Sequence, residues 1–212
     1  DVNFHLLPNE RVGLVGANGT GKTTLFRIIM RTEFADSGQV VLRKETQAAT
    51  LEQELDNFNG SVLERVVSGD RHFQTVCKEM KELESKMSAD LCSDEVTSHY
   101  GKLQHEFERL NGYEREPKAC AILSGLGFSD DKIKEPLNKF SGGWRMRVEM
   151  ARLLLRNPDV LLLDEPTNHF DLKSVEWLEG FLKNCGGSLL LISHDRRFLN
   201  SLITRVIELD RG

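Results

Sequence analysis

The sequence has little of what marks several large classes of protein. It contains no run of eighteen apolar residues, so we expect no membrane-spanning helix, and we find no signal-peptide pattern. Its cysteines are few and scattered, without a CxxC pair, which argues against a zinc site or a disulfide framework. These features favour a cytoplasmic protein with reduced thiols. The four cysteines are Cys77, Cys92, Cys120 and Cys185.

An excess of basic charge is also missing. The chain has 28 Lys and Arg against 33 Asp and Glu, a net charge of −5, so it lacks the overall basic character of many nucleic-acid-binding domains. Its 212 residues, of which 39% are hydrophobic, suit one soluble α/β domain with an inserted subdomain. Both ends, DVNFHLL and VIELDRG, have the pattern of a strand. We therefore expect a piece of a longer protein.

A glycine-rich motif follows the first well-defined strand pattern. Residues 11–16, RVGLVG, are apolar and β-branched, and GANGTGKTT then matches GxxxxGK[ST] in full ahead of the helical pattern LFRIIM. In this context the glycines let backbone N–H groups converge on an anion, and the helix N-terminus adds positive charge. The alternative is a glycine-rich turn that binds nothing. The motif predicts a phosphate loop in which Lys22 reaches the β- and γ-phosphates and the Thr23 hydroxyl binds Mg²⁺.

A second motif, PDVLLLDEPTNHFDL, covers residues 158–172. Its apolar run is typical of a central parallel strand, and two carboxylates follow at the end where open α/β sheets bind ligands. We expect Asp164 to hold the metal, directly or through water, and Glu165 to orient or deprotonate a water that attacks the γ-phosphate. Two carboxylates after a strand are by themselves more often a solvated turn, but the phosphate loop favours the site.

Two weaker candidates are a histidine and a glutamine. SLLLISHD, residues 188–195, is another buried strand pattern, and it places His194 at the same sheet edge, within plausible reach of the γ-phosphate. Gln53, in LEQE, follows a short strand candidate at residues 47–51. A lone Gln carries little information, so Gln53 becomes a candidate only through the resemblance below.

In these motifs the chain resembles an ATP-binding cassette (ABC) ATPase domain. Six motifs come in the family's order over almost the whole chain. They are the phosphate loop, the Q-loop LEQE, the signature FSGGWRMR, the Walker B strand VLLLDEP, the D-loop NHFDL and the switch histidine of ISHD. SGGWRMRVEMARLLL and DEPTNHFDLKSVEWLE are most similar to the ABC-F branch, whereas most transporter cassettes carry Gln after SGG. Phe170 stands where that branch usually has Leu, and we expect a packing change there.

The resemblance implies an α/β fold, a P-loop NTPase sheet core with an inserted α-helical subdomain, in one domain covering residues 1–212. The core would comprise residues 1–56 and 158–212, and the helical subdomain residues 57–157. It implies ATP and Mg²⁺ as ligands, with Thr23, Gln53 and Asp164 at the metal, Glu165 and His194 in catalysis and Asp171 in the D-loop. The expected ATP-binding residues are Gly16, Ala17, Asn18, Gly19, Thr20, Gly21, Lys22, Thr23, Thr24 and Gln53.

The resemblance also explains why a basic amphipathic helix starts at Ser-Gly-Gly. In such cassettes two copies face each other head to tail, and the signature of one covers the ATP of the other. Ser141, Gly142 and Gly143 would then contact ATP held by a partner cassette, with Ser141 also capping the helix. The alternative is an ordinary capped helix that packs in the core, with Arg145 and Arg147 solvated.

The segment between Gln53 and Phe140 reads as helical. SVLE, residues 61–64, fits a capping box, and apolar residues at three- and four-residue steps predict two amphipathic helices in an antiparallel hairpin, an arm at about residues 72–112. A further helix is expected at about Pro117–Leu126. From Cys77 to Glu116 there are six Lys or Arg and ten Asp or Glu, whereas a phosphate-binding arm should be basic. The arm could contact ribosomal protein, contact RNA through a few residues (Lys78, Lys81 and Lys86), or only pack.

The sequence thus predicts an ATPase that forms a sandwich with a second cassette, in the same chain or as a homodimer. ABC-F proteins lack membrane domains, usually carry two cassettes and act on ribosomes, so the ribosome and its RNA are expected partners of a nucleotide-gated clamp. The first alternative is the ATPase subunit of a membrane transporter, against which Trp144 argues. The second is an ATP-gated binding module that does not hydrolyse ATP, against which Glu165 and His194 together argue.

Overall fold

A parallel sheet forms the centre of the molecule in the computed structural model, which describes residues 2–51, 58–69, 71–88 and 93–210. The strand order in this sheet is β2-β3-β4-β1-β5, and every neighbouring pair is parallel. Because the strands are parallel, the loops that follow β1, β3 and β4 leave from the same edge. The strands are β1 (Arg11–Val15), β2 (Ala48–Thr50), β3 (Val160–Asp164), β4 (Ser188–Ile192) and β5 (Arg205–Glu208).

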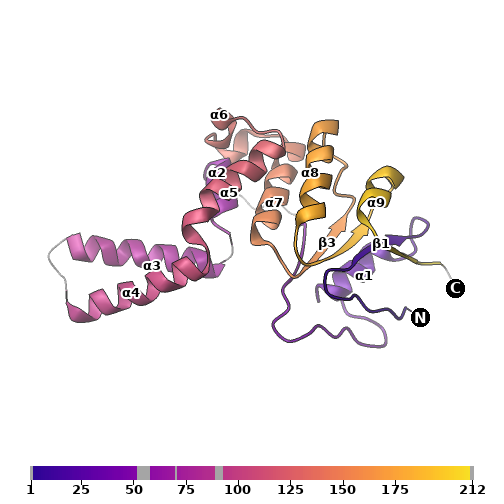
Figure 1. Ribbon diagram of the computed structural model, residues 1–212, viewed down its shortest axis with the longest axis horizontal. Coiled ribbons are helices and arrows are strands. Elements are labelled where there is room, and N and C mark those ends of the chain that lie inside the picture. The colour runs from indigo at the N-terminus through magenta and orange to yellow at the C-terminus, as the bar shows by residue number, and fades with distance from the viewer. Residues whose placement is uncertain (1, 52–57, 70, 89–92, 211–212) are drawn as a thin grey trace.

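Alternation along β3 and β4 divides the core between the two faces of the sheet. Leu161, Leu163, Leu189 and Leu191 are buried in one cluster with residues of several helices, whereas the residues between them, with Phe26, form a second cluster. Both faces are therefore covered, as the continuous apolar strands predicted. These helices include α7 (Gly142–Arg156), α8 (Leu172–Asn184) and α9 (Arg196–Leu202) on the first face, and α1 (Lys22–Ile29) lies on the second (Figure 1).

A helical region connects β2 to β3. The predicted capping box is confirmed, because the Glu64 N–H donates to Ser61 Oγ at 3.2 Å and the Ser61 N–H donates to Glu64 Oε2 at 2.7 Å. A buried ion pair, Arg65 Nε to Glu149 Oε1 at 2.7 Å, joins α2 to α7. Besides α7, this region contains α2 (Val62–Val67), α5 (Gly112–Gly125), α6 (Asp130–Ile133) and the 3₁₀ turn η1 (Leu137–Lys139).

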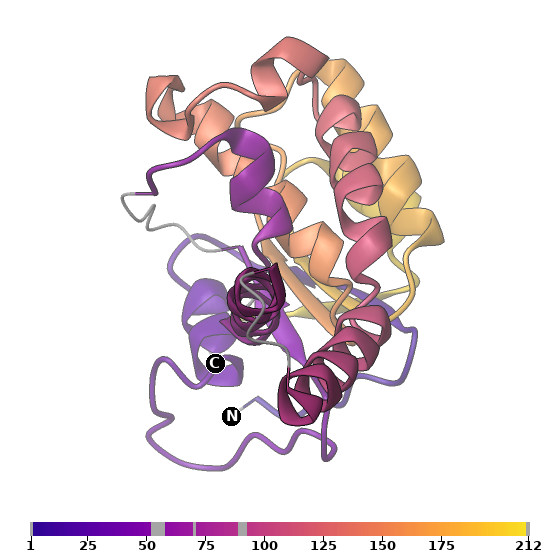
Figure 2. The same ribbon diagram turned by 90° about the vertical axis from the view of Figure 1, so that its left-hand side faces the viewer.

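Two helices, α3 (Arg71–Ser88) and α4 (Asp94–Arg109), lie side by side where the sequence predicts an arm, and they project from the rest of the molecule (Figures 1 and 2). Val76, Met80 and Leu83 are buried along α3. The next helix, α5, begins five residues before Pro117, which lies inside it rather than at its start. Among the described residues, no helix is both long and apolar enough to cross a bilayer.

The prediction of a strand in DVNFHLL, at the start of the sequence, is wrong. Residues 2–7 form no strand, and the Leu7 N–H donates instead to Glu10 Oε2 at 2.8 Å, while Arg205 Nη2 donates to the His5 carbonyl at 2.6 Å. An apolar pattern makes a strand only where another strand offers hydrogen-bonding partners. No strand of the described chain pairs with this segment.

Candidate functional site

The glycine-rich loop follows β1 and leads into α1. Gly16 has a φ of +153°, and a Cβ built there would lie 2.3 Å from the Leu209 carbonyl oxygen, so no larger residue fits without a shift of the backbone. Lys22 folds back over the loop, where its Nζ donates to the carbonyls of Gly16 at 2.8 Å and Ala17 at 2.9 Å. The ammonium group therefore lies against the loop backbone. Ala17, Asn18 and Gly19 at the loop tip are exposed.

A direct hydrogen bond joins the loop to the second motif. Thr23 Oγ1, in the first turn of α1, donates to Asp164 Oδ2 at 2.7 Å, across 141 positions of sequence. The sheet causes this meeting, because β1 and β3 both pair with β4 in parallel and end at the same edge. A hydroxyl and a carboxylate oxygen are the kind of donors that Mg²⁺ takes from proteins, so the pair fits that ion.

Glu165 follows directly on the strand and has a strained backbone. Its φ is +48°, in the left-handed region that residues with a side chain seldom adopt, and its N–H donates to the Ile192 carbonyl at 2.9 Å. Its Oε1 is buried and accepts no hydrogen bond from any residue that the structure describes. His194 Nε2 lies 3.7 Å from this oxygen, on a side chain that is 69% exposed. A buried oxygen of this kind can accept a hydrogen bond from water.

The signature end of α7 is open. Ser141 is the N-cap residue, but the expected cap bond from its side chain is absent in the described structure, a correction to the prediction. Its hydroxyl and the first turn of α7 are therefore left to other partners. A Cβ built at Gly142 would meet nothing within 4 Å, and one at Gly143 would reach only His169 of the D-loop, at 3.5 Å.

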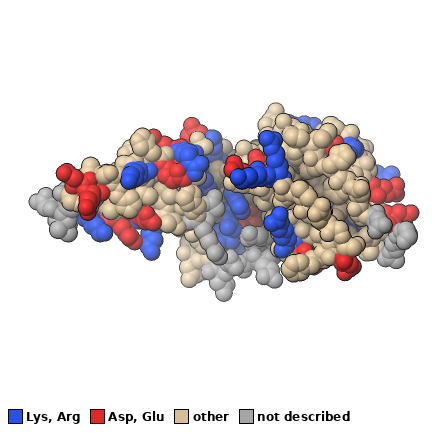
Figure 3. Space-filling view, turned by 90° about the horizontal axis from the view of Figure 1, so that it is seen from below, with Lys and Arg blue, Asp and Glu red and all other residues tan. Residues whose placement is uncertain are grey.

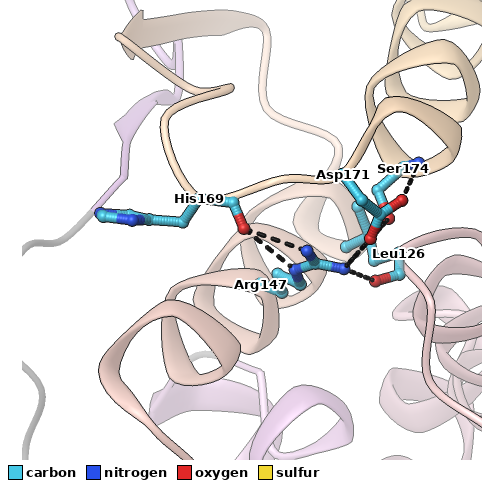
Figure 4. A network of polar contacts seen from close by, with 5 residues as sticks. All are labelled: Leu126, Arg147, His169, Asp171 and Ser174. Carbon is cyan, nitrogen blue, oxygen red and sulfur yellow. Dashed lines mark hydrogen bonds and ion pairs between the residues drawn. The ribbon is translucent and has the colours of Figure 1, made fainter.

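Arg147, which the sequence left as a possibly solvated residue, is a buried link between the signature helix and the D-loop. Its guanidinium donates to Asp171 Oδ2 at 2.8 Å, to the His169 carbonyl at 3.0 Å and to the Leu126 carbonyl at 3.0 Å (Figure 4). It also donates to the buried Ser174 Oγ at 3.1 Å. The signal for burial was present, since Arg147 lies on the same helical stripe as buried Ala151 and Leu154, but the acceptors could not be foreseen.

The D-loop residue Asp171 is held as a carboxylate by this network. The Ser174 backbone N–H, at 3.0 Å from Oδ1, and the Arg147 guanidinium lower the pKa of Asp171 to about 2. The same aspartate caps α8. The Arg147 guanidinium also lies over the rings of Trp144 at 4.7 Å and Phe170 at 5.3 Å, so Phe170 adds an aromatic contact where the branch usually has Leu.

The candidate residues thus form two groups. The first group lies at the sheet edge with the glycine-rich loop and comprises Lys22, Thr23, Asp164, Glu165 and His194. Ser141, Gly142 and Gly143 start α7, which Arg147 ties to Asp171. Gln53 lies outside the described residues.

Comparison with known proteins agrees with these motifs. The family model described as "ABC transporter" matches residues 1–168. ATP-binding protein Uup of Haemophilus influenzae is 39% identical over 210 residues, which are 99% of this chain and 32% of Uup. ABC transporter F family member 5 of Arabidopsis thaliana is 34% identical over 218 residues, covering all of this chain and 32% of the relative. The chain therefore spans about a third of the length of these relatives.

Solved structures share the fold. The dimeric post-hydrolysis state of the ATP-binding cassette MJ0796 with ADP and Pi matches 99% of this chain and 85% of that one, with a TM-score of 0.66 and 21% identity. The archaeal ribosome recycling factor aABCE1, in complex with the ribosomal stalk protein aP1, matches 96% of this chain and 32% of that one, with a TM-score of 0.65 and 22% identity. The chain is thus an α/β P-loop NTPase domain that belongs to the ABC transporter family of ATP-binding cassettes and resembles its F branch.

Proposed function

We propose that this chain is an ATP-hydrolysing cassette of a cytoplasmic two-cassette protein that acts as a nucleotide-gated clamp on the ribosome. In this proposal residues 1–56 and 158–212 form the nucleotide-binding core, and residues 57–157 form the helical subdomain that carries the signature. The observation that carries the ATPase assignment is the 2.7 Å hydrogen bond between Thr23 and Asp164, with the buried Oε1 of Glu165 on the next residue.

The loop residues 16–24 would hold the phosphates of ATP, with Lys22 exchanging its bonds to the Gly16 and Ala17 carbonyls for phosphate oxygens. Thr23 and Asp164 would hold Mg²⁺, together with Gln53. That ion would neutralise phosphate charge. The buried Oε1 of Glu165 would accept a proton from the attacking water or orient it, and His194 would contact the γ-phosphate from the neighbouring strand end.

The open end of α7 supports a second cassette as partner. Ser141 makes no cap bond, and Gly142 has free space around it, so an anion could approach the helix start closely. We propose that this anion is the γ-phosphate of ATP held by a partner cassette. The dimeric state of MJ0796 supports such a pairing for the fold.

The ribosome is proposed from similarity alone. The relative named ABC transporter F family member 5 and the structural neighbour named as a ribosome recycling factor point in this direction. The alternative, the ATPase subunit of a membrane transporter, is favoured by the family model's description and opposed by Trp144. This ring contacts Phe128 edge-to-face, with centroids 4.8 Å apart, and lies under Arg147.

The experiment is Glu165→Gln. The substitution keeps the shape of the side chain and removes the base, so ATP binding should persist while phosphate release falls by about 100-fold or more. Binding is measured with a fluorescent ATP analogue and turnover by phosphate release, each with Mg²⁺ and with excess EDTA. Parental turnover in this variant would show that Glu165 does not activate water.

A further inference from the structure

A groove at the base of the arm differs from the rest of this acidic chain. It has a volume of about 750 Å³ and lies where the end of α1, the segment before β2, the base of the arm and the end of α7 meet. Five of its lining residues are Lys or Arg and one is acidic, Glu45, a balance of five minus one, or +4, against −5 for the whole chain. Figure 3 shows Lys and Arg side chains gathered where the arm joins the core. The five cations are Arg31, Arg43, Lys44, Arg109 and Arg156.

Most of this positive charge is not neutralised within the protein. Arg109 is paired, because its Nε and Nη2 both donate to Glu106, which also contacts His72 at 2.7 Å. For the other four cations we find no ion pair or side-chain hydrogen bond with any residue that the structure describes. All four side chains are exposed. Like charges gathered around one groove repel each other, so an anionic ligand would relieve that repulsion.

The positions of the cations suit an extended polyanion. The five cations come from four separate segments around the groove, so their positive charge is distributed along it. Three of the four unpaired cations are arginines, whose planar guanidinium groups bind phosphate oxygens in pairs. A nucleic-acid backbone offers one such anion at each nucleotide. The arm itself, from Cys77 to Glu116, is net acidic, which leaves its base as the favourable place for phosphate contact.

We propose that the groove bounded by Arg31, Arg43, Lys44 and Arg156 binds the phosphate backbone of RNA. The choice of RNA rests on the proposed ribosomal function, whereas the groove is separate from the residues assigned to nucleotide binding. The contact is independent of base sequence, because it is made to phosphates. It moves the expected RNA contact from the arm lysines to the junction of arm and core.

The test uses Arg43→Glu/Lys44→Glu, with fluorescence anisotropy of a labelled 20-nucleotide single-stranded RNA at several salt concentrations. Affinity should fall about tenfold or more at low salt, and the slope of log K against log salt should decrease in magnitude by about 1.4 for two lost contacts. Arg156→Gln, a milder change on another segment, should weaken binding about two- to threefold.

The matched control is Lys102→Glu/Lys134→Glu, which changes the net charge by the same −4 at exposed positions outside the groove. Equal losses in both double variants, or none in the groove variant, would overturn the proposal. Binding of polyglutamate of equal charge at least as tightly as RNA, with the same dependence on Arg43 and Lys44, would also overturn it in favour of an acidic protein. ATP turnover is measured in parallel. Loss of RNA binding with parental turnover supports the groove, whereas absence of turnover in the parent would contradict the proposed ATPase and leave the RNA result standing.

Discussion

The starts of α1 and α7, the two helices proposed to contact phosphate, differ in their hydrogen bonds. Helix α1 begins inside its own site, where Lys22 bonds the loop and Thr23 bonds Asp164 of a distant strand. Helix α7 begins at Ser141 with no cap bond and free space at Gly142. The first start has its partners within the chain, and the second has none among the described residues. This difference is what the proposed sandwich would need, in which the α1 start holds a nucleotide within its own cassette and the α7 start meets the nucleotide of a second one.

The largest expected effect is the loss of nucleotide affinity when the positive charge of Lys22 is removed. Lys22→Ala should lower nucleotide affinity by about 100-fold, because charge-assisted bonds to phosphate contribute about 1.5–3 kcal/mol each and Lys22 can make more than one. Titration with a fluorescent ATP analogue measures this, with Lys102→Ala as the control on the arm. Unchanged affinity would contradict the proposal that the α1 start binds nucleotide through Lys22.

The second test acts on the other helix start. Ser141→Arg places bulk and charge where a partner's phosphate would lie, so turnover should fall by about tenfold or more while ATP affinity stays near the parental value. In the parent, specific activity should rise steeply with protein concentration. Phosphate release against concentration, with size-exclusion chromatography in ATP, measures both. A monomer whose specific activity is independent of concentration would show that α7 does not work on a partner.

A third test concerns the link behind the open helix start. Arg147→Met keeps much of the stem but leaves Asp171 and the carbonyls of Leu126 and His169 without their donor, so the free energy of unfolding should fall by about 2–4 kcal/mol. Urea denaturation followed by circular dichroism measures the change. Arg145→Met, which removes a partly exposed guanidinium that donates, in the described chain, only to the Phe140 and Asn138 carbonyls, should cost less. Equal losses of unfolding free energy in the two variants would show that the Arg147 network contributes no more to stability than the Arg145 side chain.

The smallest effect is a dependence on pH. The pKa of Asp171 is about 2, below the ordinary value of about 3.9. A lowered carboxyl pKa adds stability that is fully present above the unfolded value and is lost as pH falls through the folded value. The stability difference between the parent and Asp171→Asn should therefore be constant above about pH 5 and shrink between pH 4 and 2. A difference that stays constant to pH 2 would place the stabilisation elsewhere.

What could be predicted from the sequence was local in origin. The glycine-rich loop, the strand before Asp164 and the Ser61 capping box each depend on a few neighbouring residues and periodic burial, and each was found. The position of Arg147 was missed because its acceptors come from α5, the D-loop and α8. The cap bond of Ser141 was wrong because propensity places the residue but not its hydroxyl. Residues 2–7 have the apolar pattern of a strand but form none, because no strand of the described chain pairs with them.

The left-handed backbone of Glu165 places folding stability and the proposed ATPase activity in conflict at one position. A non-glycine residue at a φ of +48° costs the folded state about 1 kcal/mol, which glycine would recover. Glu165→Gly should therefore raise the melting temperature while removing the carboxylate. A search for more thermostable variants that ignores turnover would tend to select this change, so a stabilised descendant of this domain should be screened for activity at this residue first.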